Sequence, residues 1–193
     1  MKLDKNVTEI IFLLDRSGSM AGLEEDTIGG FNSFIKTQSQ QEGDTILTTI
    51  LFDDKYEVLW SGVKAKDVVL TEKEYYVRGM TALLDAVGKT IIHINQRLKI
   101  TEQKNKVIFV ITTDGMENAS KEFTYDKVNR LIKKQQEDMN WEFLFLGANI
   151  DVAKEADKIG INSNNAIEFE ASNEGIVKMY STLNETVLNF REK

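Results

Sequence analysis

Hydrophobic and polar positions alternate along this chain in two recurring patterns. The first is a short continuous apolar run rich in β-branched residues, which is typical of a strand buried on both faces. Such runs lie at residues 8–14, 45–52, 106–112, 142–146 and 166–169. A further strand-like run, residues 56–60, follows the polar residues Asp53, Asp54 and Lys55. This spacing predicts an antiparallel hairpin with the run before it.

The second pattern places apolar residues three or four positions apart, the spacing of an amphipathic helix. It predicts helices over residues 23–39, 81–100, 125–138, 152–158 and 173–190. The clearest apolar stripes are Leu84, Val87, Ile91, Ile94 and Leu98 in one helix, and Ile176, Tyr180, Leu183, Val187 and Phe190 in the last. Alternation of such strands and helices predicts an α/β fold: a Rossmann-like, doubly wound, mostly parallel sheet with helices on both faces.

Composition narrows the class of protein. The chain has 193 residues, 41% of them hydrophobic, which predicts a single domain over residues 1–193. A net charge of -7 disfavours nucleic acid as a partner. No run approaches the ~20 apolar residues of a membrane span, so we expect no membrane association. The chain has no Cys and one His, His93, which excludes disulfides and a His-rich metal site. A cytoplasmic location is expected.

Oxygen-bearing side chains follow the first apolar run at every second position. Asp15, Ser17 and Ser19 can point at one spot from an extended turn. Ligands of open parallel sheets bind at the carboxyl ends of the strands. Carboxylate and hydroxyl oxygens there suit a hard cation such as Mg²⁺. The alternative is that Asp15 or Ser19 caps the following helix.

Polar residues also follow other predicted strands. Asp114 ends a second apolar run and precedes Gly115, so it is either a ligand at the same edge or part of a simple Asp-Gly turn. Thr81 opens the helix at 81–100 and is either its N-cap or a metal ligand. Asp53 and Asp54 are candidates for ancillary polar contacts, although a hairpin turn explains them equally well.

Together, three segments resemble the metal-ion-dependent adhesion site (MIDAS) of von Willebrand factor type A domains. They are DRSGS at 15–19, TALLDAV beginning at Thr81, and ITTDG ending at Gly115. The resemblance implies a six-stranded sheet with one antiparallel edge strand. It also implies a Mg²⁺ ion, with Mn²⁺ or Ca²⁺ as alternatives, held by Asp15, Ser17, Ser19, Thr81 and Asp114. One departure is Met80, which stands between Gly79 and Thr81 where members of the family often carry Gly immediately before the Thr.

Charge balance indicates what such a site does. Two carboxylates cancel the formal charge of one divalent cation, and three hydroxyls add donors without charge. One position stays electrophilic, and the carboxylate of an Asp or Glu from a protein partner can fill it. We therefore expect a metal-dependent protein–protein interaction module and not an enzyme. The oligomeric state is left open.

Two other functions stay open at this point: a metal-dependent hydrolase or phosphotransfer enzyme, and a metal-stabilised scaffold subunit of a larger complex. Sequence evidence for catalysis is weak. Ser19 does not lie in a G-x-S-x-G motif, and His93 falls inside an apolar helix stretch. A phosphoaspartyl enzyme at Asp15 is expected, by resemblance, to carry an acid where Ser17 stands.

Overall fold

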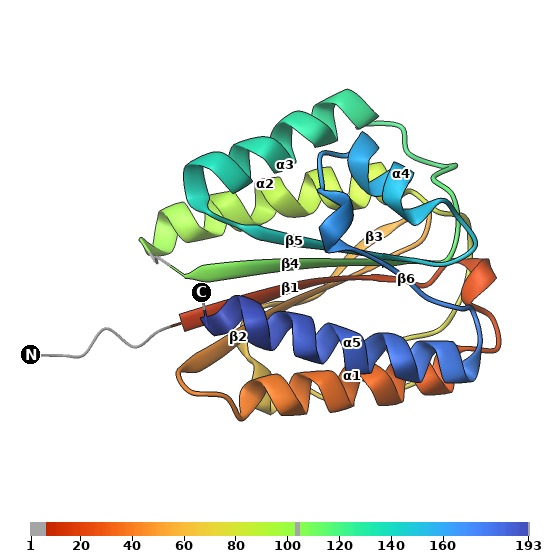
Figure 1. Cartoon of the computed structure of the whole chain (residues 1–193), viewed down its shortest axis with the longest axis horizontal. Coiled ribbons are helices and arrows are strands. Elements are labelled where there is room, and N and C mark those ends of the chain that lie inside the picture. Colours follow the sequence, from red (N-terminus) through yellow and green to blue (C-terminus); the bar gives the residue numbers. More distant parts are fainter. Residues whose placement is uncertain (1–6, 103–104, 193) are drawn as a thin grey trace, which may run out of the picture.

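Six strands form one sheet with the order β3-β2-β1-β4-β5-β6 (Figure 1). The computed structural model describes residues 7–102 and 105–192. The strands are β1 (Val7–Asp15), β2 (Asp44–Phe52), β3 (Tyr56–Lys64), β4 (Lys106–Thr113), β5 (Glu142–Gly147) and β6 (Ala166–Glu168). Only β3 runs antiparallel, against β2, and the other described pairs are parallel. The predicted sheet, with its antiparallel edge strand, is confirmed.

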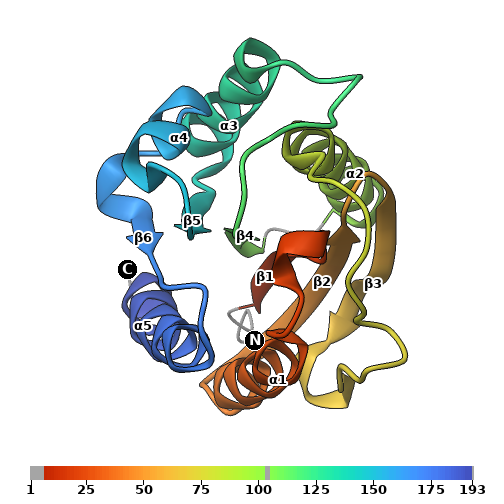
Figure 2. The same ribbon diagram turned by 90° about the vertical axis from the view of Figure 1, so that its right-hand side faces the viewer.

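Helices cover both faces of the sheet, as predicted. They are α1 (Glu24–Ser39), α2 (Leu83–Thr101), α3 (Tyr125–Met139), α4 (Val152–Lys158) and α5 (Asn173–Glu192), with short 3-10 turns η1 (Gly18–Met20), η2 (Ala65–Asp67) and η3 (Ser163–Asn165). In Figures 1 and 2, α1 and α5 lie on one face, and α2, α3 and α4 lie on the other. Within the described part of the chain, no helix combines the length and the apolarity needed to cross a membrane.

The central strand β1 has a core on each side, which explains why its sequence is apolar without alternation. Ile10, Phe12 and Leu14 pack in the core under α1 and α5. Ile11 and Leu13 pack in the core under α2, α3 and α4. The two helix stripes named above are buried at every position. The spacing of apolar residues in the sequence thus identified correctly which face of α2 and of α5 packs in the core.

Most element boundaries lie within one or two residues of the sequence expectation, and the differences at β3 and α2 matter most here. Strand β3 continues to Lys64 instead of stopping at residue 60, and its register with β2 shifts around Thr49. Because this edge strand is only partly buried, its polar residues end the apolar pattern before the strand ends. Helix α2 begins at Leu83 with Ala82 as its N-cap residue, so Thr81 is not the helix cap.

The strand order places a topological switch point between β1 and β4. From β1 the chain proceeds outward through β2 and β3, and from β4 it proceeds outward through β5 and β6. The loops after β1 and β4 therefore leave the sheet side by side at the end that faces the viewer in Figure 2. This is the position where open α/β sheets bind their ligands.

A helical glycine sets how closely α1 approaches α5. A Cβ atom at Gly30 would lie 2.1 Å from Cδ2 of Tyr180, whereas a Cβ atom at Gly29 would meet nothing within 4 Å. Tyr180 is buried, and its ring centroid lies 6.3 Å from that of Phe12. The ring therefore cannot move aside without disturbing the core.

We predict opposite effects for alanine at these two adjacent glycines. Gly30→Ala should lower the free energy of unfolding by ~1–3 kcal/mol through overpacking. Gly29→Ala should raise it by ~0.5–1 kcal/mol, because it removes backbone freedom from the unfolded chain. Urea denaturation followed by circular dichroism measures both values. Equal stability of the two variants would contradict the α1–α5 packing described.

Candidate metal centre

The loop after β1 folds back on the carboxylate of Asp15. The backbone N–H of Ser17 donates to Asp15 Oδ1 at 2.7 Å, and the hydroxyl oxygens of Ser17 and Ser19 lie 3.1 Å apart. Asp15 is fully buried. Helix α1 starts only at Glu24, and its N-cap residue is Leu23, with no side-chain capping bond. The capping alternative for Asp15 and Ser19 is therefore wrong for α1.

The loop after β4 joins this arrangement through two hydroxyl bonds. Ser19 Oγ donates to Asp114 Oδ1, and Thr113 Oγ1 donates to Asp15 Oδ2 at 2.8 Å. Asp114 is 1% exposed, which is unlike the side chain of a simple surface Asp-Gly turn. The two carboxylates, one at the end of β1 and one directly after β4, thus each accept from a hydroxyl of the segment that carries the other.

Thr81 reaches the same place from a third loop. A Cβ atom built on Gly115 would lie 3.5 Å from Ser19 Oγ and 3.8 Å from Thr81 Oγ1, so both hydroxyls line the space over that glycine. The helix that Thr81 was expected to open is capped from elsewhere, because the Leu84 N–H donates to Glu117 Oε2 at 2.9 Å. The structure therefore brings all five predicted oxygen donors to one edge of the sheet.

Burial makes both carboxylates poorly compensated anions. Desolvation raises the pKa of Asp15 to about 6, and the nearby charge of Asp114 adds to this, although bonds from Ser17 and Thr113 lower it. Burial likewise raises the pKa of Asp114. Asp114 Oδ2 is buried and has no hydrogen-bond partner among the described residues. A buried carboxylate oxygen without a donor is costly, and a cation would offset that cost.

The chemistry of the donor set fits a hard cation. Elsewhere in residues 7–102 and 105–192, as at this edge, no group of three or more His, Cys, Asp or Glu side chains is placed to hold a metal. The site combines two carboxylates with three hydroxyls instead, and oxygen donors of this kind suit Mg²⁺, Mn²⁺ or Ca²⁺. The residues present therefore fit a divalent ion, with the two acids supplying the opposite charge.

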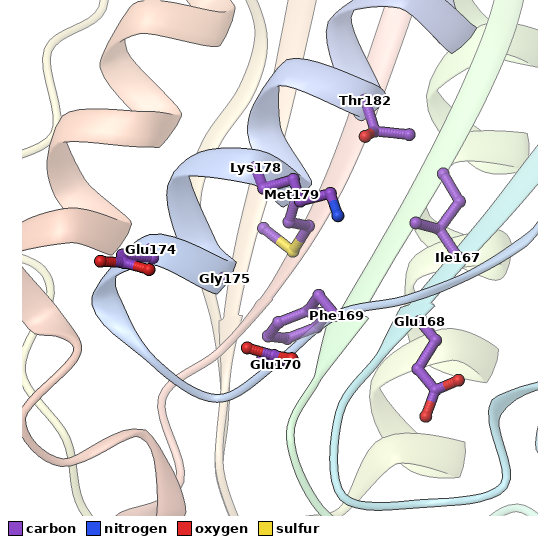
Figure 3. Close-up of a pocket in the computed structure, with 9 residues that line it drawn as sticks. All are labelled: Ile167, Glu168, Phe169, Glu170, Glu174, Gly175, Lys178, Met179 and Thr182. Atoms are coloured by element: carbon purple, nitrogen blue, oxygen red, sulfur yellow. The ribbon is translucent and has the colours of Figure 1, made fainter.

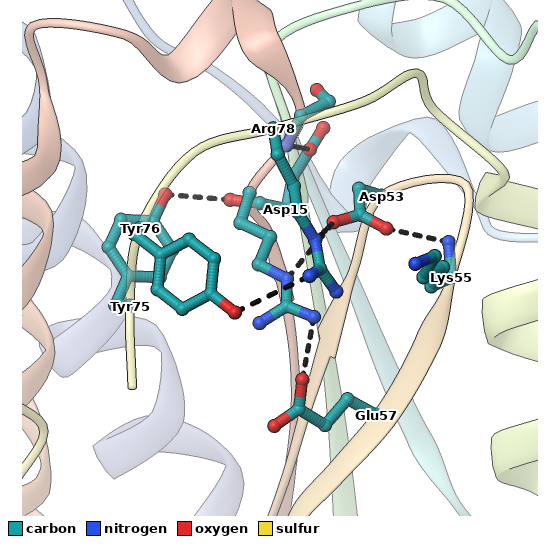
Figure 4. A network of polar contacts seen from close by, with 9 residues as sticks. Asp15, Asp53, Lys55, Glu57, Tyr75, Tyr76 and Arg78 are labelled. Atoms are coloured by element: carbon teal, nitrogen blue, oxygen red, sulfur yellow. Dashed lines mark hydrogen bonds and ion pairs between the residues drawn. The ribbon is translucent and has the colours of Figure 1, made fainter. Parts of the chain in front are cut away.

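A buried ion-pair network next to the donors escaped the sequence analysis (Figure 4). Asp53 is fully buried, and its Oδ2 accepts from Arg16 Nε at 3.2 Å and from Arg78 Nε at 2.6 Å. Its Oδ1 accepts from the N–H of Lys55 at 2.6 Å. Arg16 is also fully buried, although it lies between two expected metal ligands. Asp53 is thus a structural centre and not only a turn residue.

The same network joins the three loops through their backbones. The Arg78 N–H donates to the carbonyl of Arg16 at 2.8 Å, and the Ala82 N–H donates to the carbonyl of Asp53 at 2.9 Å. Tyr75 Oη donates to the carbonyl of Asp15 at 2.7 Å. Each bond lies within two residues of an expected donor. The relative positions of Asp15, Ser17 and Thr81 therefore depend on these contacts.

Comparison with known proteins rests on structure. No protein-family model and no curated protein matches the sequence. Proximal thread matrix protein 1 from the mussel byssus, with a zinc-occupied MIDAS motif, superposes with a TM-score of 0.65 at 15% identity, covering 95% of this chain and 46% of that chain. VWA2, the ArnB paralog of Sulfolobus acidocaldarius, superposes with a TM-score of 0.59 at 17% identity, covering 94% and 45%.

A third solved structure agrees with these two. The manganese-loaded TRAP protein of Plasmodium vivax superposes with a TM-score of 0.59 at 16% identity, covering 90% of this chain and 72% of that chain. The chain has the von Willebrand factor type A fold. It spans about half the length of the mussel and Sulfolobus proteins, at 46% and 45%. Identities this low show the fold alone.

A groove elsewhere on this von Willebrand A fold lacks converging donors (Figure 3). It lies between β6 and α5, with a volume of about 490 Å³, and none of the five expected donors lines it. Glu168, Glu170 and Glu174 border it, but Figure 3 shows their carboxylates spread around the groove and not turned to one point. The expected oxygen donors meet at the candidate metal centre, at the carboxyl ends of β1 and β4, and not in this groove.

The histidine of the chain lies on a different part of the von Willebrand A fold from the donors. His93 is on α2, and its Nε2 lies 2.8 Å from Ser61 Oγ on β3. Ser19 instead bonds to Ser17 and Asp114. The hydroxyl of Ser19 is therefore engaged with other oxygen donors, and the base that a serine hydrolase needs is paired with another residue.

We predict that Asp53→Ala costs about 3–5 kcal/mol in the free energy of unfolding, because it removes the buried partner of Arg16 and leaves that guanidinium only the half-exposed carboxylate of Glu57. Asp54→Ala is the matched control. Asp54 is exposed, so its replacement should change stability by no more than about 0.5 kcal/mol. Chemical denaturation of both variants tests this. A stable Asp53→Ala protein would mean that the network does not hold the loops.

Proposed function

We propose that this chain is a divalent-metal-dependent protein–protein interaction module. Asp15, Ser17, Ser19, Thr81 and Asp114 hold the ion, with Mg²⁺ as the proposed species. When bound, the ion supplies a Lewis-acidic position for the Asp or Glu carboxylate of a partner protein. The single observation that carries the proposal is Asp114 Oδ2, a buried carboxylate oxygen without a hydrogen-bond donor at the place where three hydroxyls meet.

The five proposed ligands differ in charge and in exposure. Asp15 and Asp114 supply two negative charges from β1 and β4, and the hydroxyls of Ser17, Ser19 and Thr81 supply neutral donors. Ser19 is exposed, whereas Asp15, Ser17, Thr81 and Asp114 are buried. The centre is therefore open to solvent on the side of Ser19 and closed on the side of the sheet. A partner has access from that one direction.

The zinc-occupied MIDAS motif of the mussel protein and the manganese-loaded TRAP protein support a divalent ion at this fold. A binding role is proposed over catalysis because Ser19 is bonded to Ser17 and Asp114 and has no histidine beside it. The likeness in fold between these proteins and this chain is the reason to test the metal first.

We predict that Mg²⁺ or Mn²⁺ raises the melting temperature, since an ion bound only by the folded state stabilises it by about 2.7 kcal/mol at 100 times its Kd. Asp114→Asn should abolish saturable binding in isothermal titration calorimetry while the fold is retained. Glu25→Gln, the same charge change at an exposed position in the first turn of α1, is the control. Equal metal affinity in the wild type and Asp114→Asn would contradict the assigned ligand.

We further predict that acidic peptides bind in a metal-dependent manner. On a peptide array, each peptide carries one central Asp or Glu and has a counterpart with Asn or Gln. In Mg²⁺ the acidic members should bind and their amide counterparts should not, because only a carboxylate forms the charge-assisted bond. EDTA and Asp114→Asn should each remove the signal. Binding that survives both treatments would overturn the proposed function.

A further inference from the structure

Several large apolar side chains are exposed to solvent on this protein. Among the residues that the structure describes they are Val58, Val69, Tyr76, Met80, Ile92, Ile100, Met116, Met139 and Val177. Singly exposed apolar residues are normal on protein surfaces. Two of these are different, because Met80 precedes Thr81 and Met116 follows Asp114 by two positions. Met80 is 56% exposed and Met116 is 63% exposed.

The loops that carry these two methionines meet at the candidate metal centre. The Gly18 N–H donates to the carbonyl of Gly79 at 3.1 Å, which places the Met80 segment beside the DRSGS loop. The Thr81 N–H donates to Asn118 Oδ1 at 2.9 Å, and the Asn118 N–H donates to the carbonyl of Thr81 at 3.0 Å. Met80 and Met116 therefore lie on two loops that are bonded to each other, each within two residues of an expected donor.

Two of the nearby acids, Glu117 and Asp85, are held by backbone donors, whereas the exposed Asp54 lies beside Gly79. Glu117 Oε1 accepts from the N–H of Ser120 at 2.7 Å, and its Oε2 accepts from Leu84 as described. Asp85 accepts from the N–H groups of Lys121, Glu122 and Phe123. Both carboxylates are thus held by backbone donors. An incoming acidic group meets apolar thioethers at this rim and not these two negative charges.

We propose that Met80 and Met116 form an apolar rim that selects a protein segment in which the metal-binding Asp or Glu stands next to a large apolar side chain. The inference rests on the proposed function and names the partner of that site. Methionine is flexible and polarisable, so it adapts to the apolar side chains of a partner. The rim distinguishes such a segment from a free organic acid and from an acidic residue in a polar context, both of which leave the methionines in water.

The test varies the residues that flank the acid. Peptides with a central Asp or Glu carry either Leu or Ser at the neighbouring positions, and acetate serves as the free acid. Fluorescence anisotropy in Mg²⁺ gives each peptide's Kd, and acetate is assayed as a competitor. The wild type should bind Leu-flanked peptides about tenfold more tightly than Ser-flanked ones, the factor expected for burying one or two methylene groups.

Substitution of the two methionines tests whether the rim causes the preference for Leu-flanked peptides. Met80→Ser with Met116→Ser should remove the preference for Leu-flanked peptides while Mg²⁺ affinity in calorimetry and binding of Ser-flanked peptides stay unchanged. Met139→Ser is the control, because Met139 is 52% exposed at the end of α3 and lies beside the start of β5, away from the carboxyl edge. It should keep the full preference.

The possible failures are distinguishable. Equal Kd values for Leu- and Ser-flanked peptides, competition by acetate as strong as by peptide, or an unchanged preference in the double variant would each overturn the rim while Mg²⁺-dependent binding of acidic peptides stands. Absence of Mg²⁺-dependent binding for every acidic peptide would overturn the proposed function, and the rim with it.

Discussion

The carboxylate of Asp53 is the polar group on which the ligand edge of this sheet depends. It bonds to Arg16 and Arg78, and the backbone of Asp53 bonds to Ala82, so one residue after β2 fixes loops that follow β1 and precede α2. Arg16 and Asp53 are both fully buried. A buried charge pair contributes little net stability but is costly to break, so it defines one arrangement of the loops over others. The positions of the hydroxyl donors therefore depend on this pair.

The order of strands in the sheet brings the two carboxylates of the site together. A strand with a core on each face favours apolar side chains along its middle, so polar residues gather towards its ends. In β1 this change occurs at Asp15, and in β4 it occurs at Thr112 and Thr113, with Asp114 directly after the strand. Because β1 and β4 are neighbours at the switch point, their terminal carboxylates face one small volume. The clustering of these oxygen-bearing side chains is thus a product of strand order as much as of sequence motif.

The helix stripes of the core could be predicted because their signals are local, whereas the meeting of five oxygen-bearing side chains at one sheet edge was expected from the resemblance of three separate segments to one motif. Helix stripes repeat within a few residues, and Asp15, Ser17 and Ser19 lie within one short loop. The Arg16–Asp53 pair could not be predicted, because its partners are 37 positions apart and a lone Arg within a polar loop resembles a solvated one. The capping of α2 by Glu117 was missed for the same reason, since the acceptor comes from 33 positions away. Thr81, like Asp15 and Ser19, gave a helix-cap signal that the fold does not use.

The pairing of β1 with β4 also constrains the order in which the molecule forms. Arg16 and Asp53 are 37 positions apart, whereas Thr113 and Asp15, bonded across β1 and β4, are 98 positions apart. Contacts of high sequence separation form late because more chain entropy is lost before they are made. Until β4 docks, one edge of β1 is unpaired, and such an edge is prone to aggregation. A cation that needs Asp15 and Asp114 together would bind only after this step, so it would slow unfolding and leave the early folding rate unchanged.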